Sequence, residues 1–327
     1  MAAETGITPW HWLGFIVFVL LAMALDLGVF HRRARTVAFR EAMAWTVAWF
    51  GLAILFGFVI APLTDARWEH QHTLEFVTGY IIEYSLSLDN VFVIAVLFAY
   101  FHVAEELQHR VLFWGVLGAL VMRGVFIGLG VALVQRFDWL LMVLGAFLVV
   151  SGFKLIFFRR REAQPEKSLT VRLAREILPV APDFDGQNFF TRLDGRLALT
   201  TLALVLLLVE VTDLIFAFDS IPAVFAVTTN PFIVFTSNIF AVLGLRSLYF
   251  VLAGAIASFR HLKTGLAVVL VFIGAKMLLM KEVQIALATS FGVVVSILAA
   301  SILASLFAQA EKPPGTRAAG RVVIDKD

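Results

Sequence analysis

The sequence predicts an all-α polytopic membrane protein with about nine transmembrane helices, and three observations lead to this fold class. Of its 327 residues, 61% are hydrophobic and only 15% are charged, against roughly 25% charged in an ordinary soluble domain. Most of the apolar runs reach the ~20 residues that a helix needs to cross the hydrocarbon of a bilayer. The ten-residue alternating pattern of a membrane β-barrel is absent, so helices are the expected spanning elements.

Clusters of charge divide the apolar residues into nine predicted spans. They cover residues 11–30, 43–61, 76–100, 111–133, 139–158, 197–226, 233–256, 265–280 and 283–310. The first run differs from a secretory signal peptide, because Glu4 precedes it and Arg32, Arg33 and Arg35 follow it. We therefore expect it to remain as a membrane span.

The distribution of lysine and arginine predicts the orientation in the membrane. With the amino terminus outside, the inner loops and the carboxyl-terminal tail hold 19 of these residues and the outer loops hold three. The positive-inside rule therefore places the amino terminus outside and the carboxyl terminus in the cytoplasm. Because the basic residues lie just outside the spans, the net charge of +2 indicates contact with the lipid bilayer. It does not indicate binding of nucleic acid.

The two halves of the chain contain a repeated motif. Residues 83–92 read EYSLSLDNVF and residues 213–222 read DLIFAFDSIP, so both have an acid, five residues, and then Asp followed by Asn or Ser. Eight residues separate Gly115 from Arg123 in the next helix, and eight separate Asn238 from Arg246 in its counterpart. A lysine completes each unit: SGFK at 151–154 ends in Lys154 and IGAK at 273–276 ends in Lys276.

These matches predict two consecutive units of three helices each. Because three is odd, the second unit must enter the membrane from the opposite side, which makes an inverted repeat. The predicted organisation is two N-terminal helices (1–62), a first repeat (63–158), a cytoplasmic loop (159–196), a second repeat (197–282), a final helix (283–310) and a cytoplasmic tail (311–327).

Charged residues inside the predicted spans are the candidate site. The acids are Asp26, Glu83, Asp89, Glu210, Asp213 and Asp219, and the bases are Arg123, Lys154, Arg246 and Lys276. Two structural interpretations compete with a functional one: the arginines pair with acids to hold helices together, and the lysines, near helix ends, extend toward the interface. Pairing alone leaves a surplus of acids, so either some carboxyls are protonated or a cation binds.

Helix geometry limits how these acids can cooperate. Glu83 and Asp89 are six residues apart, which is about 240° of rotation and about 9 Å of rise on a regular helix. Pro222 is expected to break the sixth span and free the carbonyl oxygen of Phe218. The sequence thus predicts two half-broken helices that face each other at mid-membrane. Their carboxylates, the Asn90 amide, the Ser220 hydroxyl and freed carbonyl oxygens form the predicted site.

Oxygen ligands favour a hard divalent cation such as Mn²⁺, Mg²⁺ or Ca²⁺. The chain has no cysteine, which excludes thiol chemistry and thiolate metal sites. Its seven histidines lie in terminal or loop stretches, so metals that prefer imidazole are disfavoured. We expect no prosthetic group.

The segment 83–92, and above all the segment 210–250, resemble the TerC/Alx family of bacterial integral membrane proteins. The second reads EVTDLIFAFDSIPAVFAVTTNPFIVFTSNIFAVLGLRSLYF, and the resemblance extends from the first span to the ninth. Alx-type members of this family are implicated in manganese export, and other members are named for tellurium resistance. The resemblance implies that the metal site of this chain consists of Glu83, Asp89, Asn90, Glu210, Asp213, Asp219 and Ser220.

Together these observations predict a secondary transporter in the bacterial inner membrane that exports Mn²⁺, in exchange for protons. One alternative is a TerC-type scaffold in tellurium resistance or in metal delivery to secreted proteins, with protein partners on the 159–196 loop. Another is an intramembrane aspartyl protease built on Asp89 and Asp219, although Leu88 and Phe218 precede these acids instead of the usual Tyr or Gly. An older family label, membrane redox modulator, finds no support in a chain without cysteine or an evident haem ligand pair.

The long inner loop, 159–196, carries eight basic and six acidic residues. Within it, Leu169, Leu173 and Ile177 are spaced for one face of a helix. This spacing predicts an amphipathic helix over 166–178 that lies near the inner membrane surface.

Overall fold

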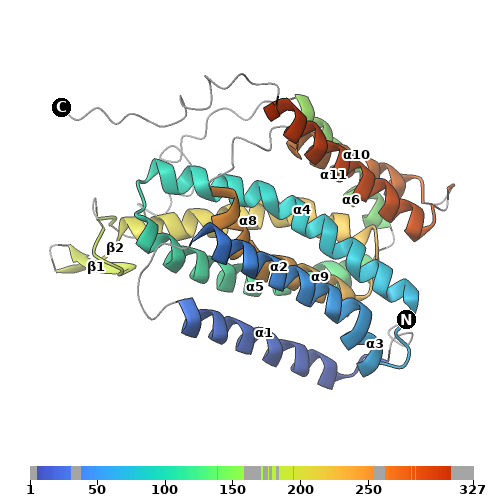
Figure 1. Ribbon diagram of the computed structural model, residues 1–327, viewed down its shortest axis with the longest axis horizontal. Helices are drawn as coiled ribbons and strands as arrows, with labels where there is room; N and C mark the ends of the chain where they lie inside the picture. Colours follow the sequence, from blue (N-terminus) through green and yellow to red (C-terminus); the bar gives the residue numbers. More distant parts are fainter. Residues whose placement is uncertain are drawn as a thin grey trace.

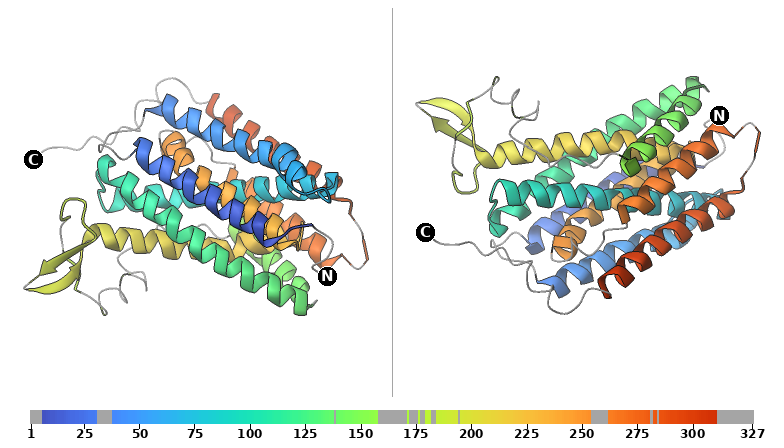
Figure 2. Two further views of the ribbon diagram at one scale, coloured as in Figure 1. Left: turned by 90° about the horizontal axis from the view of Figure 1, so that it is seen from below. Right: turned by 90° about the horizontal axis from the view of Figure 1, so that it is seen from above.

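Long apolar helices that run alongside one another make up most of the molecule (Figure 1; Figure 2). This computed structural model describes residues 6–30, 38–137, 139–157, 171, 176, 179–181, 184–193, 195–253, 262–280, 282–283 and 285–310. The elements before the first long connection are α1 (Pro9–Phe30), α2 (Phe39–Leu55), the π-helical turn η1 (Phe56–Ile60), α3 (Ala61–Thr64), α4 (His70–Tyr100), α5 (Glu105–Arg136) and α6 (Trp139–Phe157). After it come β1 (Phe190–Leu193), β2 (Arg196–Leu199), α8 (Thr201–Phe225), α9 (Pro231–Ala253), α10 (Leu262–Leu278) and α11 (Leu287–Ala310).

Within the described chain, seven helical stretches are long and apolar enough to cross a membrane, and α1 and α10 add two shorter apolar helices. Each of the nine predicted spans falls on one of these helices, with α2 extended through η1 and α3. The predicted fold class, an all-α membrane protein, is confirmed. The division of the helices into inverted repeats stays a prediction at this point.

Helices α4 and α5 begin about two turns before their predicted starts, at His70 and Glu105. Their polar first turns lie beyond the apolar run but continue the same helix, because a helix can project past the hydrocarbon of a bilayer. The expectation that all histidines lie in terminal or loop stretches is therefore wrong. His72 lies in the first turn of α4, and His109 in α5 is 7% exposed.

The expected helix break at Pro222 is absent. Helix α8 continues through Pro222 from Thr201 to Phe225, and α4 likewise has no interruption. A proline removes only one backbone donor, and packing against neighbouring helices holds the flanking turns in place. The prediction of two half-broken helices is wrong, although the Phe218 carbonyl still lacks a Pro222 N–H to accept from.

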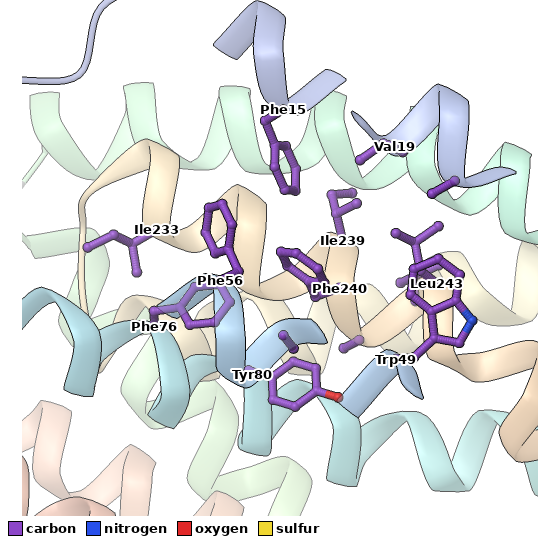
Figure 3. Packing of buried hydrophobic residues seen from close by; sticks show 14 of the residues in the cluster. Phe15, Val19, Trp49, Phe56, Phe76, Tyr80, Ile233, Ile239, Phe240 and Leu243 are labelled. Atoms are coloured by element: carbon purple, nitrogen blue, oxygen red, sulfur yellow. The ribbon is translucent and has the colours of Figure 1, made fainter. Parts of the chain in front are cut away.

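Helix α9 lies at the centre of the bundle. In its membrane-length window 89% of residues are buried, against 17% in α6 and in α11. The ring of Phe240 on α9 lies 5.1 Å from that of Phe56 and 5.9 Å from that of Phe76, centroid to centroid. Figure 3 shows these rings gathered with Phe15 in one aromatic cluster. Polar side chains on α9 are therefore enclosed by protein and shielded from lipid.

Helices α6 and α10 lie together with α11 at the upper right of Figure 1, and glycines let α6 and α10 approach closely. An added Cβ on Gly152 would lie 2.8 Å from the carbonyl oxygen of Ala267, and one on Gly274 would lie 2.6 Å from that of Gly145. Small residues at such a crossing let two helix backbones pack directly, which is a common way to join helices in a membrane. These four positions join α6 and α10 into a pair.

Strands β1 and β2 form an antiparallel hairpin at one end of the bundle, at the left in Figure 1. Nearby, the ring of Phe189 packs edge-on against Trp114 of α5, with centroids 6.4 Å apart. Helices α4, α6 and α9 end at this side of the bundle, and α5, α8 and α10 begin there. We call it the hairpin end, and the opposite side the far end.

The hairpin was not predicted from the sequence, although a signal for it exists. Leu193 pairs with Arg196 across the dipeptide Asp194-Gly195, and Gly195 has a φ of 78°. Asp-Gly between two short runs is typical of a two-residue hairpin turn, because glycine adopts positive φ at little cost. The amphipathic helix predicted over 166–178 lies almost entirely outside the described residues.

Candidate functional site

A buried arginine joins two helices at the middle of the bundle. Arg123 of α5 is 1% exposed and forms ion pairs with Glu83 of α4 and Asp213 of α8. Its Nε donates to Asp213 Oδ2 at 3.1 Å and its Nη2 donates to Asp213 Oδ1 at 2.9 Å. The guanidinium thus holds Asp213 with two parallel hydrogen bonds, the strongest geometry available to this pair.

Two amide side chains complete this cluster. Asn238 of α9 accepts from Arg123 Nη1 at 2.8 Å and donates to Glu83 Oε2 at 2.9 Å, while Asn90 of α4 donates to Asp213 Oδ1 at 3.0 Å. Each carboxylate is therefore bound by the guanidinium and by one amide. With both acids ionised, one arginine leaves this buried cluster a formal charge of −1, which is costly away from water unless hydrogen bonds or a further cation compensate.

Beside this cluster lies a cavity of about 780 Å³. It contains two further predicted acids, Asp89 of α4 and Asp219 of α8, and the Ser151 hydroxyl of α6 donates to Asp219 Oδ1 at 2.9 Å. Its polar lining is Glu83, Asp89, Asn90, Arg123, Ser151, Lys154, Asp219 and Ser220. A space of this volume holds many water molecules, since each occupies about 30 Å³ in the liquid. A hydrated ion therefore fits beside these acids.

The cavity extends from the middle of the bundle toward the hairpin end. Lys154 and Leu155, in the last turn of α6, line it together with Leu266, near the start of α10. Toward the far end, Met277 is 2% exposed and packs against α6, where an added Cβ on Gly145 would approach its Cβ to 2.8 Å. The lining of this cavity thus reaches the hairpin end of the bundle.

Three other predicted residues lie away from this cavity. Glu210 lies on α8 at the backbone of α5, where an added Cβ on Gly118 would overlap its carboxylate. Arg246 of α9 is 6% exposed and lines two smaller cavities, one of which also contains Asp213. Lys276 is half-buried in the last turn of α10. The structure therefore does not bring all five predicted acids together.

The acids divide into two sets and one separate residue. Glu83 and Asp213 bind Arg123, Asp89 and Asp219 line the large cavity, and Glu210 packs on α5. Among the residues that the structure describes, no three Asp, Glu or His side chains are gathered as ligands for one metal ion. The metal-binding role of the predicted residues stays a prediction, and in this conformation a guanidinium occupies one pair of carboxylates.

Sequence reasoning missed two residues of this site. Asn238 was recognised only as a position in the repeat, and Ser151 only as part of the SGFK segment. An amide or hydroxyl in an apolar span needs a partner inside the protein, so both residues carried a usable signal. Which acid each would bind depends on the helix crossings, which the sequence does not specify.

Comparison with known proteins places this chain among bacterial membrane proteins. A family model described as "Integral membrane protein TerC family" matches residues 68–313. The chain is 49% identical over 317 residues to the uncharacterized membrane protein STKORF319 of Myxococcus xanthus, covering 96% of this chain and 98% of that protein. It is 47% identical over 296 residues to an Escherichia coli K12 protein named membrane-bound redox modulator Alx, covering 89% and 92%. An uncharacterized membrane protein of Rickettsia bellii is 36% identical over 295 residues, covering 90% and 96%.

No solved structure is significantly similar to the chain. The apolar helices, the family match and the length of the aligned relatives agree, and the expected family resemblance is confirmed. This chain is a multi-pass membrane protein and belongs to the TerC family of integral membrane proteins.

Proposed function

We propose that this protein is a secondary transporter that exports a divalent metal ion through the middle of the bundle. The observation that carries the proposal is the cavity of about 780 Å³ in which Asp89 and Asp219 lie beside the arginine-bound pair Glu83 and Asp213. Acids within membrane helices are costly and mark ion pathways when they face a water-accessible space. Four carboxylates from α4 and α8 lie at or beside this cavity.

The transporter would work by alternating access between two inverted repeats, 63–158 and 197–282. Alignment of the two units makes Glu83 equivalent to Asp213, and these two acids share one guanidinium, that of Arg123. A residue that contacts equivalent positions of both units lies close to the two-fold axis expected for inverted repeats. The arginine cluster thus supports an axis that passes through the middle of the bundle.

The contact between α6 and α10 supports the same axis. In the alignment, Gly152 is equivalent to Gly274 and Gly145 is equivalent to Ala267. Gly152 faces the backbone of Ala267, and Gly274 faces the backbone of Gly145. The same contact is therefore made twice with the roles of the two helices exchanged, which is the pattern that a two-fold axis produces.

In this mechanism a positive charge on the protein and the metal ion compete for the same carboxylates. The hydrated ion enters the cavity and binds first at Asp89 and Asp219, and the pair held by Arg123 becomes available when the guanidinium withdraws. Protons or basic side chains replace the metal when it leaves, because carboxylates buried without any counter-charge are unstable. Where protons replace the metal, they bind the carboxylates as it leaves and are released when the next ion binds, and export is then coupled to protons.

We propose Mn²⁺ as the transported substrate. The cavity offers only oxygen ligands: carboxylates, the Asn90 amide and the Ser220 hydroxyl. Such ligands suit Mn²⁺, Mg²⁺ and Ca²⁺, whereas Zn²⁺ gains little without histidine or cysteine, and Mg²⁺ loses its water reluctantly. The choice of Mn²⁺ among the hard cations follows the resemblance to the TerC/Alx family.

We place the protein in the bacterial inner membrane with the hairpin end in the cytoplasm. The excess of lysine and arginine lies in the loops at that end, in keeping with the positive-inside rule. With this orientation the cavity faces the cytoplasm, where an exporter loads its substrate. Lys154, which lines the cavity near its cytoplasmic side, is then available as a second positive charge.

The test is a flux assay with the purified protein in liposomes and a panel of divalent ions. We expect Mn²⁺ to move without any other protein, and a pH gradient to change the rate. The matched control is Glu106→Gln, which removes an exposed acid at the hairpin end of α5 and is expected to leave the flux unchanged. Cleavage of a model transmembrane peptide, measured in the same liposomes, tests the alternative of an aspartyl protease.

A folded protein that moves no divalent ion would overturn the proposal and favour a TerC-type scaffold in tellurium resistance or metal delivery. The name of the Escherichia coli relative describes that protein as a redox modulator, which is a different function from transport. In the present chain, thiol redox chemistry is excluded because no cysteine is present.

A further inference from the structure

Two arginines occupy equivalent positions in the aligned repeats, yet the structure treats them differently. The segment GVLGALVMRG at 115–124 aligns with NIFAVLGLRS at 238–247, which makes Arg123 equivalent to Arg246. Arg123 lies between Glu83 and Asp213, and in the described part of the chain both of these acids form their ion pairs with Arg123. Both arginines are nearly buried, at 1% and 6% exposure.

Arg246 nevertheless lies close to the same acids. A small cavity of about 20 Å³ on the hairpin side of the cluster is lined by Arg246, Asp213 and Asn90 together. Gly115 lines this cavity, and it is the position equivalent to Asn238, whose amide binds Arg123 and Glu83 on the far side. The small cavity beside Gly115 and Arg246 on the hairpin side thus occupies the place that the Asn238 amide and Arg123 occupy on the far side.

From this placement we propose that Arg123 and Arg246 take turns in binding Glu83 and Asp213, and that the exchange switches which end of the bundle is closed. The inference rests on the proposed function, because it uses the two-fold relation between the repeats. In the observed state Arg123 and Asn238 close the far side. In the opposite state Arg246 binds the two acids and closes the hairpin side.

Charge and geometry make the exchange mutually exclusive. Both oxygens of Asp213 are bound to Arg123, at 3.1 and 2.9 Å, and Oδ1 also accepts from Asn90. A second guanidinium cannot form the same two bonds while Arg123 is in place. Two positive charges buried beside the same carboxylate also repel each other. Arg246 is therefore a positioning residue: it acts on the substrate only by selecting the state of the acids.

The absence of cysteine from the chain allows a direct test. Leu155, which lines the cavity at the hairpin end, is equivalent to Met277, which is 2% exposed at the far end. Leu155→Cys and Met277→Cys each introduce a single thiol, and its rate of reaction with a water-soluble maleimide reports the opening of that end. The measurement uses the purified full-length protein in detergent and needs no transport.

The two arginine substitutions are expected to act in opposite directions. Arg123→Ala removes the closure of the far side, so the Met277→Cys thiol should react at least about tenfold faster, since loss of one partner of a buried ion pair is strongly destabilising. Arg246→Ala destabilises the opposite state, in which the hairpin side is closed and the far end is open. The Met277→Cys thiol should therefore react more slowly, and the Leu155→Cys thiol should react at least as fast as before. Arg246→Lys keeps the charge and should restore part of the far-end reaction.

A second pair of variants leaves both arginines in place. Gly115→Asn supplies Arg246 with the amide that Asn238 supplies to Arg123, and Asn238→Gly removes that amide from the far side. Both should increase the reaction of Met277→Cys. An added Cβ on Gly115 lies 3.3 Å from Val209 Cγ1, so the asparagine fits with a small movement of that side chain. These variants keep the inference testable if Arg123→Ala does not fold.

Reciprocal changes in thiol reaction support the exchange, and changes in the same direction, or none, overturn it. The outcome is separable from that of the proposed function. Reciprocal labelling without ion flux would retain the arginine exchange and reject the transporter, whereas flux without reciprocal labelling would retain the transporter and reject the exchange.

Discussion

The two ends of the helix bundle are built from similar sequence but packed differently. At the far end, Arg123, Glu83 and Asn238 form a closed cluster and Met277 is buried against α6. At the hairpin end, Leu155, the equivalent of Met277, lines a cavity of about 780 Å³ together with Lys154 in the last turn of α6. The equivalent residues Met277 and Leu155 are therefore packed differently, although both ends carry an arginine and a lysine at matching positions.

Asymmetry between two similar halves gives the bundle a direction. The glycine contacts between α6 and α10 are equivalent in the two repeats, because Gly152 faces the backbone of Ala267 and Gly274 faces that of Gly145. The helices α4, α5, α8 and α9 carry the asymmetry, since Glu83 and Asp213 both form ion pairs with Arg123 and Asn238 binds on the far side. A movement that exchanges the two ends would then keep α6 and α10 together and rearrange the other four.

The largest effect is expected from locking the closed end. An added Cβ on Gly79 of α4 would lie 3.5 Å from Cβ of Ser237 on α9, within the roughly 3.5–4.5 Å spanned by a disulfide. The double variant Gly79→Cys/Ser237→Cys should lose Mn²⁺ flux in liposomes when oxidised and regain it with a reductant. Each single variant is the control. Full flux through the oxidised double variant would contradict opening of the far end.

Next in size is the removal of a cavity acid. Asp219→Asn and Asp89→Asn keep the side-chain volume and remove the charge, so the protein should fold and Mn²⁺ flux should fall to background. Glu106→Gln, which changes an exposed acid at the hairpin end, should transport normally. Near-normal flux in either cavity variant would reject the acids as the substrate site.

The α6–α10 contact predicts a moderate loss of stability. Gly274→Ala places a Cβ 2.6 Å from the carbonyl oxygen of Gly145, and such overpacking typically costs about 1–3 kcal/mol. Gly128→Ala is the matched control, because no atom lies within 4 Å of its added Cβ. Thermal unfolding in detergent should show a lower midpoint for Gly274→Ala only. Equal midpoints would mean that α6 and α10 do not depend on this close approach.

A smaller effect is expected from proton competition at the cavity acids. Carboxylates must lose their protons to bind a divalent ion, so Mn²⁺ affinity should fall as the pH is lowered. Calorimetry in two buffers of different ionisation enthalpy should reveal protons released on binding, and Asp219→Asn should release fewer. Binding without proton release, or a strong preference for Zn²⁺ over Mn²⁺, would count against a proton-coupled carboxylate site.

The smallest effect is expected at the hydroxyl that binds Asp219. Ser151→Ala removes the 2.9 Å hydrogen bond from Ser151 Oγ to Asp219 Oδ1, a contribution of about 0.5–1.5 kcal/mol. Mn²⁺ affinity should change by no more than about tenfold. Ser290→Ala is the control, because in the described contacts its hydroxyl bonds to the carbonyl oxygen of Ala286, directly before its own helix. A complete loss of binding in Ser151→Ala would make the hydroxyl a metal ligand.

Much of the fold follows from the sequence, because length and hydrophobicity of a membrane helix are local properties. All nine predicted spans fall on helices, so the charged positions within them lie on helices as well. The break at Pro222 was wrong, since packing from neighbouring helices compensates for one lost donor. The hairpin β1–β2 was missed, although Asp194-Gly195 signals it.

The membrane class, the helices, the family and the set of costly intramembrane charges can be read from the amino-acid sequence. The pairing of Glu83 and Asp213 with Arg123, and the contact of Asn238 with this cluster, became visible only in the folded bundle. Hydrophobicity acts on each segment alone, whereas the partner of a buried charge depends on which helices meet and at which turn.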